Sequence, residues 1–104
     1  MKIDINNIKL EDVVRLATTM ANSRGTDLLE DAGCGMTNVY MPALGFDNAI
    51  VQCYPNGDYK DVWIVLPKND DNPSVTLSEL PELLQFDVVE KYCAHLGFTI
   101  TIEK

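Results

Sequence analysis

Residues 49–66 read Ala-Ile-Val-Gln-Cys-Tyr-Pro-Asn-Gly-Asp-Tyr-Lys-Asp-Val-Trp-Ile-Val-Leu, two apolar and aromatic runs on either side of a turn. The turn, Pro55-Asn56-Gly57-Asp58, contains the residue types of tight hairpins, because Asn and Gly tolerate left-handed backbone conformations. In the second run apolar side chains alternate onto both faces, as in a central strand that is covered on both sides. The stretch therefore predicts a β-hairpin with strands at 49–54 and 59–66.

Helical patterns flank this hairpin on both sides. Apolar residues recur at spacings of three, four and seven from Leu10 to Ala21, and Gly25 is placed to end that helix. Residues 26–31 would add a further helical turn. Beyond the hairpin, four leucines from Leu77 to Leu84 give a helical pattern that is entered from Ser78 and is interrupted or begins near Pro81. A better-defined helix is predicted to start at Asp87, with Glu90 completing a capping-box-like pair, and to end before Gly97.

Alternating or apolar segments predict further strands at 2–5, 38–44 and 98–103. The expected order is strand, helix, three strands, helix, strand. Because 104 residues is the length of one typical domain, we predict a single α+β domain over residues 1–104. We expect a mainly antiparallel sheet of about four to five strands, with two main helices packed on one face.

The chain is acidic, with 16 Asp and Glu against 8 Lys and Arg and a net charge of −8. Nucleic acids and anionic membranes are bound through Lys and Arg, so we expect no direct nucleic-acid partner and no membrane association. Such a charge steers the approach of a basic protein partner. Three cysteines without a Cys-x-x-Cys pair and a start without an apolar signal core favour a cytoplasmic location.

Six acidic residues lie between Lys68 and Lys91 with no basic residue among them, which gives this interval −6 of the net −8. The start of the predicted helix accounts for two of them, Asp87 and Glu90, through the helix dipole. We predict that the other acids bind the partner, with two tyrosines beside the turn as aromatic anchors. The predicted partner-binding residues are Asp70, Asp71, Glu79, Glu82, Tyr54 and Tyr59.

No motif for a metal or cofactor is present, and we predict neither. Cys93 and His95 would point about 200° apart on a helix, too far to share one ion. Cys34 stands between two glycines, and a thiolate nucleophile would need a base, for which His95 is the single histidine. A small Cys/His-dependent enzyme therefore stays as an alternative.

Together these features favour a non-enzymatic binding protein that neutralises a basic toxin or nuclease domain. The class that matches best in general character is a cytoplasmic immunity protein against a nuclease-type toxin. A phage-type inhibitor of a host nuclease or defence complex, acting by nucleic-acid charge mimicry, would use the same surface physics. An inert subunit whose acidity serves solubility is a further alternative, and the sequence leaves the oligomeric state open.

Overall fold

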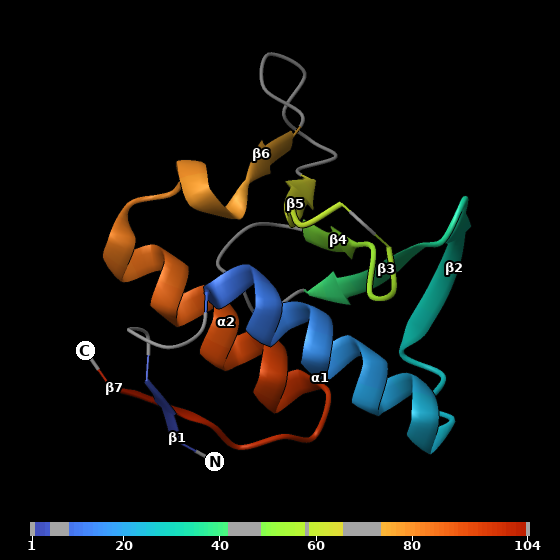
Figure 1. Ribbon diagram of the computed structural model, residues 1–104, viewed down its shortest axis with the longest axis horizontal. Coiled ribbons are helices and arrows are strands. Elements are labelled where there is room, and N and C mark those ends of the chain that lie inside the picture. Colours follow the sequence, from blue (N-terminus) through green and yellow to red (C-terminus); the bar gives the residue numbers. More distant parts are fainter. Residues whose placement is uncertain (1, 5–8, 42–48, 58, 66–73, 104) are drawn as a thin grey trace.

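The computed structural model describes residues 2–4, 9–41, 49–57, 59–65 and 74–103 (Figure 1). These residues form two α-helices, a five-stranded antiparallel sheet and a two-stranded parallel sheet, so the predicted α+β class is confirmed. In chain order the elements are β1 (Lys2–Asp4), α1 (Leu10–Arg24), β2 (Leu29–Gly33), β3 (Met36–Met41), β4 (Ala49–Cys53), β5 (Trp63–Val65), β6 (Ser74–Thr76), the 3₁₀ helix η2 (Leu77–Glu79), α2 (Glu82–His95) and β7 (Thr101–Glu103).

The larger sheet is a meander in which β2 to β6 pair in chain order, each antiparallel to the next. Its register sets Val51 opposite Val39 on one side and Ile64 on the other, so these three side chains share one face of the sheet. All three are at most 1% exposed and belong to the main hydrophobic core. Tyr40 lies on the opposite face and is 53% exposed.

The helix α1 forms where the sequence predicts it. Its periodic apolar residues are buried except Met20, which is 37% exposed, and Gly25 ends the helix in a left-handed conformation with φ 76°. Figure 1 shows α1 lying beside α2. The Tyr92 hydroxyl of α2 lies 2.6 Å from Thr18 Oγ1 of α1, and the Cys53 thiol of β4 donates to the same oxygen at 3.5 Å. This junction places α1 on the sheet face that carries Cys53.

The helical turn predicted for residues 26–31 is wrong. The chain turns sharply after Gly25, with the Leu28 N–H donating to Thr26 Oγ1, and residues Leu29–Gly33 then form the edge strand β2. Backbone pairing with β3, in which Leu29 lies opposite Val39, makes this segment a strand and not a helical turn. With β6, which was also not predicted, five strands instead of three separate the two helices.

The predicted helix start at Asp87 is also wrong. The helix α2 begins at Glu82, directly after Pro81, and continues through Asp87, whose carboxylate pairs with Lys91 at 3.0 Å. Phe86, which is 5% exposed, anchors this part of the helix in the core. A capping box precedes this helix at η2, where the Glu79 carboxylate accepts from the Thr76 N–H and hydroxyl.

The two ends of the chain pair with each other. The strands β1 and β7 run parallel, with Ile3 opposite Ile102.

The predicted central position of β5 is confirmed, because this strand lies between β4 and β6 in the larger sheet, although it begins only at Trp63.

Candidate functional site

The structure describes four of the six predicted partner-binding residues. Asp70 and Asp71 lie outside the described residues. Glu79 and Glu82 are both exposed, one at the end of η2 and the other in the first turn of α2. Tyr54 is half-buried and Tyr59 is 65% exposed.

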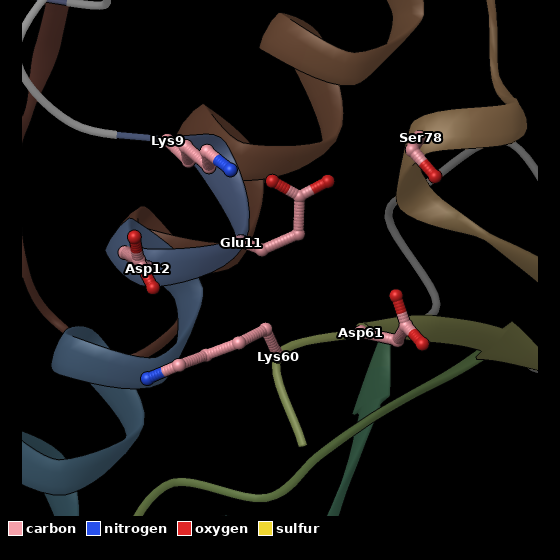
Figure 2. Close-up of a pocket in the computed structure, with 6 residues that line it drawn as sticks. All are labelled: Lys9, Glu11, Asp12, Lys60, Asp61 and Ser78. Carbon is pink, nitrogen blue, oxygen red and sulfur yellow. The ribbon is translucent and has the colours of Figure 1, made fainter. Parts of the chain in front are cut away.

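A hollow of about 390 Å³ lies between the start of α1, the segment before β5, and η2. Figure 2 shows its side chains, with the Glu11 carboxylate between Lys9 and Ser78, and with Lys60 extending towards α1. The Leu77 N–H donates to the Val62 carbonyl at 2.7 Å, which joins η2 to the segment before β5. The lining residues are Lys9, Glu11, Asp12, Lys60, Asp61 and Ser78.

This hollow gathers carboxylates that sequence reasoning missed. Three of its lining residues are acidic, Glu11, Asp12 and Asp61. The two predicted acids that the structure describes, Glu79 and Glu82, do not line the hollow but follow Ser78 in the chain, and we call these five residues together the acidic end. Lys9 and Lys60 offset two of these five charges. Asp12 lies 3.4 Å from the Arg15 guanidinium, and Glu79 also serves the capping box. Asp61 and Glu82 are both exposed and form no ion pair within the described residues.

The two predicted tyrosines lie together. Their ring centroids are 5.1 Å apart, and Trp63 meets Tyr54 edge-on at 6.0 Å. The half-buried Arg15 of α1 holds the turn that carries them. Its Nε donates to the Tyr54 carbonyl at 2.9 Å and its Nη2 donates to the Gly57 carbonyl at 2.8 Å. The helix α1 thereby positions the aromatic cluster of Tyr54, Tyr59 and Trp63.

A second hollow of about 300 Å³ lies beside the two tyrosines and is lined in part by the exposed Cys34. Cys34 has φ 55°, and both flanking glycines also have positive φ, which a tight turn between β2 and β3 requires. His95 does not line this hollow; it ends α2, away from the β2–β3 turn (Figure 1). The structure therefore does not bring Cys34 and His95 together.

The other two thiols are buried in the core. Burial raises the pKa of Cys93 to about 11, and burial likewise raises the pKa of Cys53. Both are therefore protonated near neutral pH, which makes them poor nucleophiles. In the part of the chain that the structure describes, no group of three or more His, Cys, Asp and Glu side chains is arranged to hold a metal ion.

Neither helix within the described ranges is long and apolar enough to cross a membrane. No protein-family model, curated protein or solved structure matches this chain. Function is therefore inferred from the charges and the geometry of its own residues.

Proposed function

We propose that this chain is a small acidic binding protein that neutralises a basic protein partner. The observation that carries the proposal is the acidic end, where three carboxylates, from the start of α1 and from the segment before β5, line one open hollow beside Ser78. Two further exposed carboxylates, Glu79 and Glu82, follow Ser78 in the chain. The net charge of −8 adds a long-range field that attracts a cationic surface.

The chemistry of carboxylates suits a partner that handles nucleic acid. The Lys and Arg side chains that hold phosphate also form short, charge-assisted hydrogen bonds with Asp and Glu. A protein bound through the acidic end would cover such a cationic cleft, or a site beside it, and so block the partner. The specific form that we propose is a cytoplasmic immunity protein against a nuclease-type toxin. A phage-type inhibitor would act through the same contacts, and the identity of the partner separates the two.

The experiment is capture of partners from the native lysate with the tagged protein, followed by washing at low and high salt and mass spectrometry. A basic toxin or nuclease domain that is released at high salt supports the proposal, since exposed charge pairs are screened by salt. A partner that has no basic surface and that salt does not release contradicts it.

Charge reversal then tests the acidic end itself. We expect Asp61→Lys and Glu82→Lys each to weaken binding of the captured partner by about tenfold, or ~1.4 kcal/mol. The matched control is Glu90→Lys, an exposed position in the middle of α2 with the same change of charge. Equal weakening by the control would show that these carboxylates are not a contact surface. Glu79 is unsuitable for this test because its carboxylate also stabilises η2.

The enzyme alternative makes a different prediction. Cys34→Ala and His95→Ala should both abolish function in a Cys/His-dependent enzyme and leave a binding protein almost unaffected. The separate positions of these two residues favour the second result.

A further inference from the structure

Two open hollows adjoin where the β2–β3 turn meets the β4–β5 turn. One, of about 300 Å³, contains the ring pair of Tyr54 and Tyr59. The other, of about 310 Å³, contains Glu30 and Asp31, and the two hollows share Gly35 and Asn56 as walls. We call the pair the turn groove and define it by Glu30 and Asp31 in one hollow, Tyr54 and Tyr59 in the other, and the shared walls Gly35 and Asn56.

The charge of the turn groove has one sign. Glu30 and Asp31 are exposed, and no Lys or Arg is among the described residues that line either hollow. The basic side chains closest in sequence to the tyrosines or bonded to the turn, Lys60 and Arg15, do not line the groove. Lys60, the residue after Tyr59, lines the hollow at the acidic end (Figure 2). Arg15 lies on the α1 side of the turn, where its guanidinium donates to turn carbonyls and to Asp12. A cation entering the groove therefore meets ring faces in one hollow and is attracted by the carboxylates of the other.

The aromatic part of the groove is suited to a planar cation. The rings of Tyr54 and Tyr59 are inclined at 38° with centroids 5.1 Å apart, and Tyr59 is the more exposed of the two. A guanidinium or ammonium group is attracted to such ring faces. Arginine is favoured over lysine, because its flat, weakly hydrated guanidinium stacks on an aromatic ring better than a compact ammonium group does.

The walls of the groove are held in place before any ligand arrives. Arg15 fixes the turn carbonyls of Tyr54 and Gly57. At Gly57 an added Cβ would lie 3.2 Å from the Tyr54 Cβ, so the backbone packs closely against that tyrosine. A preformed site loses less conformational freedom on binding than a flexible one.

We propose that the turn groove is an anchor site for an arginine side chain of the basic partner, with the guanidinium on the rings of Tyr54 and Tyr59 and with the carboxylates of the adjoining hollow attracting its charge. The inference rests on the proposed function and deepens it, because it adds a second contact surface to the acidic end and names the side chain that this surface receives.

The test that needs no partner is an NMR titration of the ¹⁵N-labelled protein with an acetylated, amidated arginine hexapeptide. Amide shifts should concentrate at Gly35, Asn56, Gly57 and Tyr59, and a lysine hexapeptide should bind more weakly. We expect Tyr59→Ala to weaken arginine-peptide binding about two- to fivefold, the range of an exposed cation–π contact. Tyr40→Ala is the matched control, because Tyr40 is also exposed but does not line the groove.

Two results would overturn the inference: shifts confined to the acidic end, or equal effects of Tyr59→Ala and Tyr40→Ala. Tyr59→Phe should retain binding, which separates the ring from its hydroxyl.

Binding measurements with the captured partner distinguish a failure of the turn-groove proposal from a failure of the proposed function. If Glu82→Lys weakens binding while Tyr59→Ala and Glu30→Lys do not, the groove is not an anchor site and the proposed function stands. If neither high salt nor Glu82→Lys changes the binding of the partner, the proposed function fails. The hexapeptide titration then still tests whether the turn groove binds arginine.

Discussion

The hydroxyl of Thr18 joins three elements of the fold at one fully buried point. It donates to the Val14 carbonyl at 2.7 Å and lies within hydrogen-bond distance of the Tyr92 hydroxyl and the Cys53 thiol. A buried polar group is costly unless it is paired, so each of these groups depends on the others. This geometry selects one packing of α1 against α2 and β4.

We therefore expect Thr18→Val to lower the free energy of unfolding by about 1–3 kcal/mol, because the buried Tyr92 hydroxyl loses its partner. Chemical denaturation measures this loss. The control is Thr19→Val, whose hydroxyl bonds the Arg15 carbonyl at a half-buried position and which should cost less. Adding Tyr92→Phe to Thr18→Val should recover part of the loss. Equal costs for the two threonines would refute the role of the junction.

The buried Cys93 thiol predicts an effect of pH. Its pKa is about 11 in the folded protein against 9.0 for the free group, so the folded state retains the proton over this interval while the unfolded state loses it. The stabilising contribution is complete below about pH 9 and is lost as the pH rises through about 11. We expect the free energy of unfolding to fall over this interval, and to fall less steeply in Cys93→Ala. An unchanged slope in the variant would contradict this assignment.

At the scale of elements, Arg15 connects α1 to the β4–β5 turn. Its side chain is 12% exposed, and two of its nitrogens reach turn carbonyls at 2.9 and 2.8 Å. Lysine keeps the charge but cannot reproduce the planar fork of donors.

We expect Arg15→Lys to lower the free energy of unfolding by about 1–3 kcal/mol and to speed amide hydrogen exchange at Asn56 and Gly57. Exchange followed by NMR separates this local loosening from a general loss of stability. Lys91→Ala is the control, since the ion pair of Lys91 with Asp87 is exposed and should contribute little. Unchanged exchange at the turn would show that Arg15 does not hold it.

The elements differ in how far their own residues specify them. The helix α1 was predictable because its periodic apolar residues and Gly25 lie within one continuous segment. The strand β2, Leu-Glu-Asp-Ala-Gly, contains no β-branched residue and forms through its pairing with β3, which no local pattern reveals. The capping box of Thr76 and Glu79 follows a local pattern, since a Thr is followed three residues later by a Glu, and it marks the start of η2.

The residues of the candidate site also differ in how far local sequence predicts their positions. The proximity of Tyr54 and Tyr59 was predictable, because a short turn links them. The meeting of Ser78 with Asp61 depends on the backbone hydrogen bond between Leu77 and Val62, which joins residues distant in the chain. Side chains gathered by such long-range pairing cannot be assigned to one surface from local spacing.

At the scale of the whole molecule, the net charge of −8 acts on stability as well as on binding. Like charges repel in the compact state, and this repulsion is screened when the Debye length falls from about 30 Å at 0.01 M salt to about 3 Å at 1 M. We expect the melting temperature to rise over this range of sodium chloride while affinity for a basic partner falls. Calorimetry and binding measured on the same samples test this pair of opposite trends. A melting temperature that is indifferent to salt would argue against significant self-repulsion.

The edge-on contact between Trp63 and Tyr54 gives the molecule an optical property. Trp63 is the single tryptophan of the chain, and the ring that it touches forms one wall of the turn groove. Indole emission responds to changes in the packing and polarity around the ring. A guanidinium that stacks on Tyr54 should therefore alter the fluorescence of Trp63, so that the protein reports occupation of the groove without an added dye.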